Sequence, residues 1–182
     1  MIPPRPTAAG RRGALLTLGA LAAVPLAGCE AGVPRVFASL GAARQAIAAL
    51  AHAPGARSSG AWALPQVLVH LAQSIEYSLQ GYPVPRSALF QQTLGRVAFA
   101  VFDARGAMHH ALDEPIPGAP ALAGGVDLPA AAARLLAAID AFDAHAGVLQ
   151  PHFAYGALDK PAYTRAHLMH IGQHWSEVLS AT

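Results

Sequence analysis

The apolar residues of this chain recur at helical spacing, in segments that proline and glycine separate. Alanine is abundant and β-branched residues are few, which favours helix over strand. No stretch longer than four residues alternates between apolar and polar residues in the way that a half-buried strand does. The sequence therefore predicts an all-α domain.

Five helical segments are expected between the proline and glycine breaks. They cover residues 35–52, 64–80, 87–109, 128–147 and 161–179. The apolar residues of the third segment are spread widely around the helix, so we expect it to be bent or to pack on two sides. The arrangement predicts a bundle of four main helices, with this extra helical segment between the second and third.

Residues 1–28 have the parts of a bacterial export signal. Arg5, Arg11 and Arg12 give a basic start that contains no acid. The apolar run that follows, residues 13–26, is shorter than the roughly 20 residues of a membrane-spanning helix. The arginine pair predicts the twin-arginine route, with general secretion as the alternative.

Residues 26–29 read Leu-Ala-Gly-Cys, the lipobox pattern of bacterial lipoproteins, so we expect Cys29 to carry the lipid anchor. The alternative is an uncleaved apolar helix with an incidental cysteine. Cys29 is the only cysteine, which excludes an internal disulfide and a cysteine nucleophile or ligand in the mature domain. Residues 29–34 are then a tether and residues 35–182 the domain. The mature protein would face the periplasm, and Glu30, where aspartate would signal inner-membrane retention, favours the outer membrane.

The mature part of the chain is close to neutral. Three of the 12 Lys and Arg residues lie in residues 1–28, and none of the ten acids does. The rest of the chain therefore has nine cations and ten anions. Without a basic stripe, nucleic acid is excluded as an expected partner. Charged residues make up 12% of the chain, against about 25% in an ordinary protein. Some apolar surface should therefore be exposed or covered by a partner, such as a second copy in a homodimer.

Histidines are the most informative residues of the mature domain. The last helical segment carries His167, His170 and His174. His170 and His174 lie one turn apart and can direct both imidazoles at one metal ion, while His167 and His170 offer the i, i+3 alternative. His70, among apolar residues in the middle of the second helix, is the candidate third ligand. Alternatively, His70 hydrogen-bonds a neighbour and the other three lie on a surface.

Two of these segments resemble the metal-ligand helices of the DinB/YfiT-like superfamily. A tryptophan there precedes a helix with a His-Leu pair, as Trp62 precedes His70, and the last helix carries a pair of histidines four apart. The middle of the chain is similar to the DUF1569 branch, a family of uncharacterised proteins. That similarity lies in residues 74–78, 81–83 and 152–156. The resemblance covers about residues 35–180, essentially the whole mature domain.

The resemblance implies a DinB-like four-helix bundle that holds one divalent metal ion, nickel or zinc, on His70, His170 and His174. His167 is the alternative to His170. Gln73 can orient a ligand from the next turn of its helix, and His152 lies in a loop expected to cover the pocket.

Superfamily members with assigned activities look like thiol-dependent transferases, isomerases and hydrolases. The resulting hypothesis is a metal-dependent hydrolase or transferase that acts on a small molecule, with no catalytic residue identified. The alternative is a non-catalytic metal-binding or interaction lipoprotein. Room and polar groups beside the metal would favour the enzyme, and a pocket filled by Trp62 and Phe153 would favour the alternative.

Overall fold

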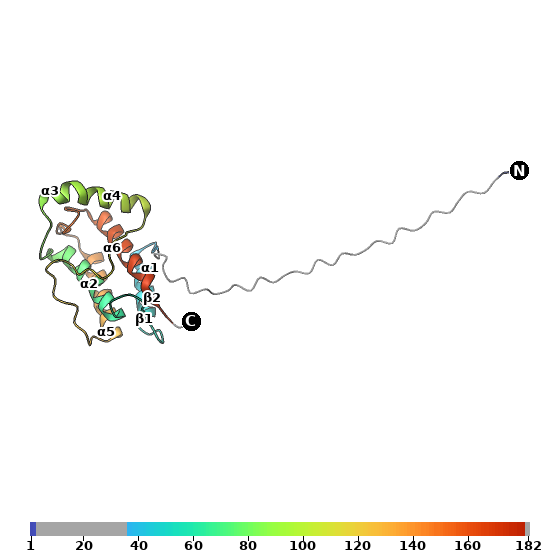
Figure 1. The fold of residues 1–182 in the computed structure, drawn as a ribbon, viewed down its shortest axis with the longest axis horizontal. Helices are drawn as coiled ribbons and strands as arrows, with labels where there is room; N and C mark the ends of the chain where they lie inside the picture. The colour runs from blue at the N-terminus through green and yellow to red at the C-terminus, as the bar shows by residue number, and fades with distance from the viewer. Residues whose placement is uncertain (3–35, 181–182) are drawn as a thin grey trace.

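The computed structural model describes residues 1–2 and 36–180, and the second range is mostly helical (Figure 1). The all-α class is therefore confirmed. The helices are α1 (Leu40–Leu50), α2 (Leu64–Gln80), α3 (Ala88–Phe90), α4 (Arg96–Arg105), α5 (Leu128–Ala144) and α6 (Lys160–His174). A π-helix, η1 (Gln91–Gly95), joins α3 to α4, and a 3-10 turn, η2 (Trp175–Glu177), follows α6. Residues 3–28 of the expected signal, Cys29 and the expected tether lie outside the described residues.

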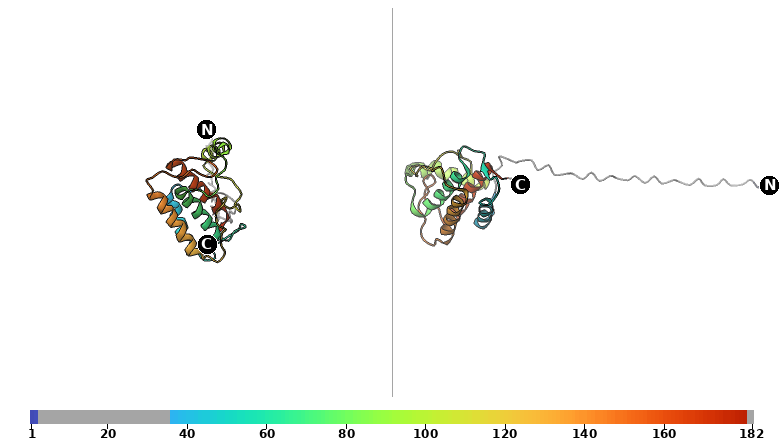
Figure 2. Two further views of the ribbon diagram at one scale, coloured as in Figure 1. Left: turned by 90° about the vertical axis from the view of Figure 1, so that its left-hand side faces the viewer. Right: turned by 90° about the horizontal axis from the view of Figure 1, so that it is seen from below.

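The four longest α-helices, α1, α2, α5 and α6, pack together and enclose the core (Figures 1 and 2). On α5, Leu135, Ile139 and Phe142 follow one another at helical spacing, and each is 0% exposed. Burial of one such side chain contributes roughly 1.5–3 kcal/mol. Helix α5 packs against α2, which also contacts α6, and Phe142 of this stripe lies 4.8 Å from the ring of His167 on α6.

The helix starts follow from capping residues. Asp127 caps α5 and Asp159 caps α6, each by accepting a hydrogen bond from a backbone N–H three residues later. A proline stands in the first turn of α2, α5 and α6, where its missing N–H has no helical partner to lose. The start of α6, the helix with three histidines, is thus fixed by the sequence around Asp159.

The end of the last helix differs from the expectation. The predicted helix 161–179 was wrong beyond His174, because the chain leaves the helix through η2 and forms β2 (Val178–Leu179). This strand pairs antiparallel with β1 (Arg57–Ser58), and the Ser59 N–H donates to the Glu177 carbonyl oxygen at 2.8 Å. Pairing with a strand distant in the sequence therefore replaces the last helical turn and anchors the end of α6.

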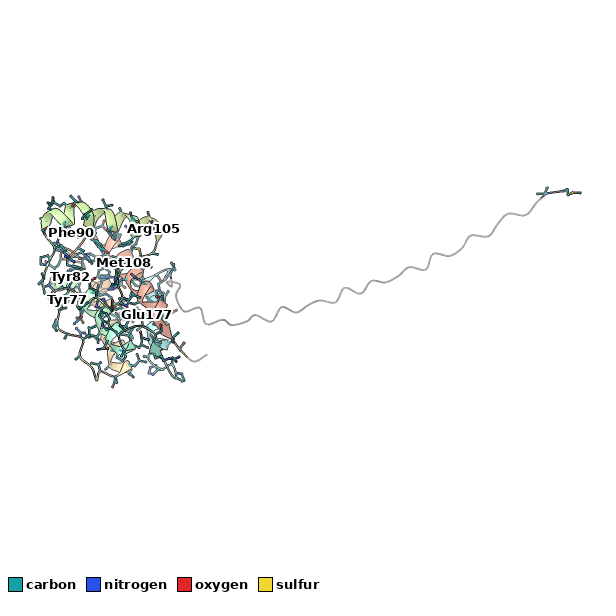
Figure 3. All side chains as sticks on the ribbon, viewed as in Figure 1. Tyr77, Tyr82, Phe90, Arg105, Met108 and Glu177 are labelled. Carbon is teal, nitrogen blue, oxygen red and sulfur yellow. The ribbon has the colours of Figure 1, made fainter. Side chains whose placement is uncertain are left out.

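The predicted third helical segment consists of α3, η1 and α4. The π-helix widens this segment at residues 91–95, and the segment ends at Arg105, short of the predicted residue 109. The segment runs along the outside of the molecule, between Phe90 and Arg105 in Figure 3, and α4 has no buried residue. Several large apolar side chains on it are exposed: Leu89, Leu94, Val97 and Val101.

The first helix is shorter than predicted. It begins at Leu40 rather than at residue 35, since Ser39 caps it by accepting from the Ala42 N–H. None of the helices in the described ranges has the length and apolar character that crossing a membrane requires.

Candidate metal centre and adjoining cavity

The structure brings the three predicted ligands together between α2 and α6. Their ligand nitrogens lie within 4.8 Å of one another, and all three residues belong to one group that could hold a metal ion. The Nε2 atoms of His70 and His170 are 3.2 Å apart. Two nitrogens bound to one tetrahedral zinc ion at about 2.0–2.1 Å would be separated by about 3.3 Å. His70 therefore points towards α6, and the helical spacing of His170 and His174 aims both rings at the same place.

Several nitrogens of this group lack a hydrogen-bond partner. Among the described residues, none is bonded to His70 Nδ1 or to either ring nitrogen of His174, although these atoms are buried. A buried polar atom without a partner costs about 1–3 kcal/mol. Because His70 faces His170 through its Nε2 atom, an ion between the three rings would supply the missing partner of one His174 nitrogen, and in that respect the arrangement fits a bound metal.

Burial also sets the protonation state of the three rings. It lowers the pKa of His70 to about 4 and that of His174 to about 3, and it holds the pKa of His170 well below the usual value. The rings are therefore neutral at pH 7, the form in which imidazole binds a metal. Three neutral imidazoles suit zinc or nickel.

Two aromatic rings surround the group. The indole of Trp62 lies 4.9 Å from the ring of His70 and is stacked nearly parallel to that of His174 at 6.3 Å. The ring of His110 lies 5.1 Å from that of His170. Gln173 of α6 donates to the His110 carbonyl oxygen at 2.7 Å, which holds the loop after α4 against α6. Trp62 thus packs against the side of the histidine group.

The other candidate ligands lie elsewhere. Gln73 donates to the carbonyl oxygen of Pro120 at 3.4 Å, and no hydrogen bond joins it to His70. His167 is buried beside Ser78, with its Nε2 3.3 Å from the hydroxyl oxygen, and its ring packs at 4.8 Å against that of Phe142. Burial lowers the pKa of His167 to about 3. Neither residue belongs to the group formed by the three histidines.

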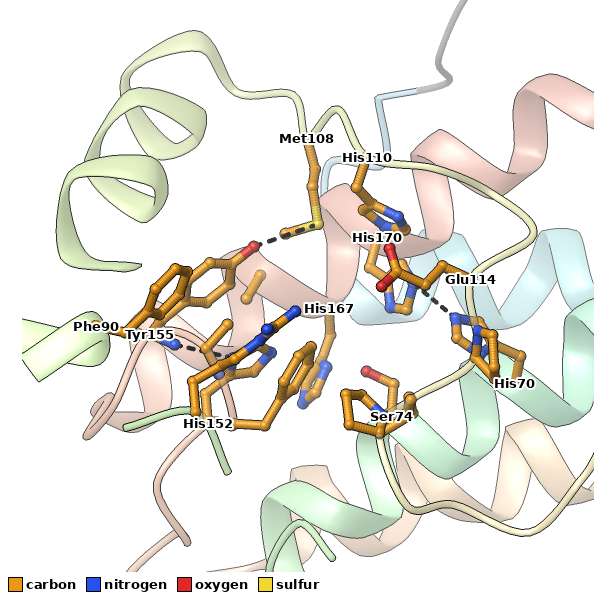
Figure 4. Close-up of a pocket in the computed structure, with 17 residues that line it drawn as sticks. His70, Ser74, Phe90, Met108, His110, Glu114, His152, Tyr155, His167 and His170 are labelled. Carbon is orange, nitrogen blue, oxygen red and sulfur yellow. Dashed lines mark hydrogen bonds between the residues drawn. The ribbon is translucent and has the colours of Figure 1, made fainter. Parts of the chain in front are cut away.

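A cavity of about 210 Å³ adjoins the histidine group (Figure 4). His70 and His170 form part of one wall, and Phe90, His152 and Tyr155 lie across from them. This volume is below the roughly 300–1,000 Å³ of drug-sized ligand pockets, so the cavity suits a smaller molecule. Phe153 contributes to the wall, so the aromatic residues leave room beside the candidate metal site.

Two acids that lie near the candidate ligands in the sequence, Glu76 and Glu177, do not line this cavity. Glu76 forms a two-pronged ion pair with Arg134 of α5. The backbone carbonyl of Glu177 accepts from Ser59, in the link between η2 and the residue after β1. Neither residue lines the cavity.

Sequence reasoning missed three polar residues of the site. Glu114, Arg86 and His110 all line the cavity, and each comes from an irregular segment. Figure 4 shows Glu114 and His110 beside His170. The pair His109 and His110, directly after the third helical segment, was the available signal for one of them. Loop residues show no periodicity, so no comparable signal marked the other two.

Comparison with known proteins places the whole domain in one family. The family model of DUF1569, described as a protein of unknown function, matches residues 35–181. No curated protein gave a match, and neither did a solved structure. The match covers nearly all of the region that contains the helices, the histidine group and the cavity. The chain therefore belongs to the DUF1569 family.

Proposed function

We propose that this protein binds one divalent metal ion, zinc or nickel, through His70, His170 and His174 and acts on a small molecule in the adjoining cavity. The observation that supports this most directly is the buried group of neutral imidazoles with unpartnered nitrogens, open to a space of substrate size. An ion on three imidazoles can polarise a substrate oxygen or lower the pKa of bound water towards ~7. The proposed reaction is hydrolysis.

The residues that line the cavity have different roles in the proposed reaction. Glu114 is the one carboxylate among the cavity-lining residues, and it lies on the side of the histidine group. In our proposal its carboxylate accepts a proton during the reaction. Phe90 and Ile116 also line the cavity, and in our proposal their apolar side chains exclude bulk water.

The proposed location favours hydrolysis over thiol transfer. We propose that residues 1–28 export the chain by the twin-arginine route and that Cys29 anchors it by lipid to a membrane, preferably the outer one, facing the periplasm. The support is the sequence pattern of residues 5–29. Small thiol cofactors belong to the cytoplasm, whereas water is present on both sides.

A DinB-like architecture is part of the proposal. Its support is the packing of α1, α2, α5 and α6, with the α3–η1–α4 segment inserted between α2 and α5. His70 lies on α2 and His174 on α6, the positions that the resemblance implies for the first and last ligands.

The second candidate function is a non-catalytic metal-binding lipoprotein that docks a partner. The exposed apolar side chains of the α3–η1–α4 segment, such as Leu94 and Val97, favour it. The cavity, with a carboxylate and a guanidinium in its wall, favours the enzyme. An activity screen with esters and amides, carried out on metal-loaded protein, separates the two functions.

The first experiment is metal analysis by mass spectrometry on the full chain, purified without a polyhistidine tag. We expect about one ion of zinc or nickel per chain in the wild type. The His170→Ala, His174→Ala double variant should lose it. A His52→Ala, His109→Ala double variant, which removes two exposed histidines, should keep it. Absence of metal after reconstitution, or an unchanged content in the first variant, would contradict the proposal.

A further inference from the structure

His152 is held in one tautomer by the backbone of its own loop. Its Nδ1 atom accepts hydrogen bonds from the backbone N–H groups of Ala154 and Tyr155, at 3.1 and 3.2 Å. A nitrogen that accepts from two donors carries no proton itself, so in the neutral ring the proton is on Nε2. The ring is stacked against that of Tyr155 at 4.2 Å, nearly parallel, which fixes its orientation.

The Nε2–H group of His152 is open to the cavity. His152 is 9% exposed and lines the cavity wall. Its Nε2 makes no hydrogen bond to a described residue. It is also not one of the fully buried polar atoms without a partner, so it is accessible. Burial lowers the pKa of His152 to about 3, so the ring stays neutral at pH 7 and keeps this single donor.

Arg86 supplies a positive charge from the neighbouring segment. Its backbone N–H donates to the Phe153 carbonyl oxygen at 2.8 Å, and the Gln91 side chain donates both to that oxygen and to the Arg86 carbonyl oxygen. The guanidinium carbon lies 5.6 Å from the ring centre of Phe90. Within residues 36–180, no acid forms an ion pair with Arg86, which lines the same cavity as His152.

The polar groups of the cavity are thus arranged in two sets. The histidine group and Glu114 lie on one side, and His152 lies on the other, near Phe90 and Tyr155 (Figure 4). Arg86 and His152 are held close through the backbone at Phe153. The Arg86 guanidinium and the His152 Nε2–H group together offer hydrogen-bond donors and a positive charge but no acceptor. This combination matches a pair of oxygen atoms that share a negative charge.

We propose that Arg86 and the Nε2–H of His152 bind the carboxylate of a small organic acid whose apolar body fills the cavity towards the histidine group. One guanidinium matches a singly charged carboxylate, and the negative charge of Glu114 in the same cavity disfavours a doubly charged phosphate. The aromatic rings of Phe90 and Tyr155 suit an apolar body. That such an acid is the substrate rests on the proposed function. Binding of its carboxylate by Arg86 and His152 needs no metal.

The test is calorimetric titration of the full chain, kept metal-free with a chelator, with benzoate as the probe and benzyl alcohol as its neutral counterpart. Arg86→Met and His152→Phe should each weaken benzoate binding about tenfold or more, since each removes a hydrogen bond to a charged group. His152→Gln, which keeps a donor, should retain more affinity than His152→Phe. The matched control Arg96→Met, on the exposed helix α4, should bind benzoate as the wild type does.

A second readout separates recognition from a general disturbance of the loop. Long-range ¹H–¹⁵N NMR of the wild-type histidine rings should show His152 protonated on Nε2, with that resonance shifted by benzoate and unshifted by benzyl alcohol. Protonation on Nδ1, equal benzoate affinity in Arg86→Met, or absence of saturable benzoate binding up to about 10 mM would each overturn the proposal. Because no metal is present, failure here leaves the metal analysis intact, and failure of the metal analysis leaves this result intact.

Discussion

Replacing His174 by leucine should stabilise the metal-free protein while it abolishes metal binding. His174 is 1% exposed, and both of its ring nitrogens are buried without a partner among the described residues. Leucine is of similar size and has no polar atom to satisfy. His174 would then be a residue that binds the metal ion but destabilises the metal-free protein.

The magnitude follows from the two unpartnered atoms. Each costs about 1–3 kcal/mol, and repacking around a different side chain of similar volume costs less than about 1.5 kcal/mol. His174→Leu should therefore raise the free energy of unfolding at pH 7.5 by at least about 0.5 kcal/mol and by up to about 6 kcal/mol. At this pH the histidines are neutral in both the folded and the unfolded state, so ionisation makes no contribution.

Lowering the pH should enlarge the difference. Burial lowers the pKa of His174 from 6.5 to about 3, so between these values the unfolded state binds the proton more readily than the folded state. The wild type then loses stability as the pH falls from 6.5, by about 2 kcal/mol at pH 5 for this one residue. His174→Leu lacks this loss, and its advantage at pH 5 should be about 2 kcal/mol larger than at pH 7.5.

Urea denaturation followed by circular dichroism, with a chelator at pH 7.5 and pH 5, measures both quantities. His167→Leu is the matched control on the same helix. The Nε2 of His167 is 3.3 Å from the Ser78 hydroxyl, so its replacement removes a hydrogen bond and should not stabilise the protein at pH 7.5. If His174→Leu is instead destabilised at pH 7.5 by as much as this control, the argument from unpartnered nitrogens is refuted.

Three further predictions concern the scaffold, each checked by urea or thermal denaturation. Gly95→Ala should destabilise by about 1–3 kcal/mol and lower the melting temperature, because a Cβ there would collide with the Ala154 carbonyl oxygen; an unchanged melting temperature would refute the close approach of η1 to the cavity wall. Asp159→Ala should cost about 1 kcal/mol through loss of the α6 cap, whereas no change would mean that the cap is not formed in solution. Arg134→Met should change stability by less than about 1 kcal/mol, since its ion pair with Glu76 is partly exposed, and a larger loss would contradict the weak coupling expected there.

Local sequence signals predicted the parts of the fold that depend on local forces. The bounds of α2 match the expectation at both ends, because Pro65 marks its first turn and Gly81, at φ 100°, ends it. The proximity of His170 and His174 follows from helical spacing alone. That His70 meets them depends on how α2 packs against α6, and here the expectation came from its place among apolar residues in the middle of a helix, to which the family resemblance was added.

Features set by contacts between distant segments were not predictable from local patterns. The strand β2 forms only because β1 lies beside it, so the helical periodicity of residues 175–179 was misleading. Arg86 and His152 come together through one backbone hydrogen bond between two loops. Periodicity carries no information about which loops meet, so this half of the cavity could be seen only in the structure.

The distance along the chain between the candidate ligands determines when the site can form during folding. His70 and His170 are 100 residues apart in sequence, and β1 pairs with a strand that ends the described chain. Closing loops of this length is entropically unfavourable until the core supports it, so these contacts form late and slow the folding of an otherwise helical domain. A chain still lacking α6 holds only His70 of the three histidines. In the proposed metal-bound protein, the ion would therefore stabilise the finished domain after α6 has been added.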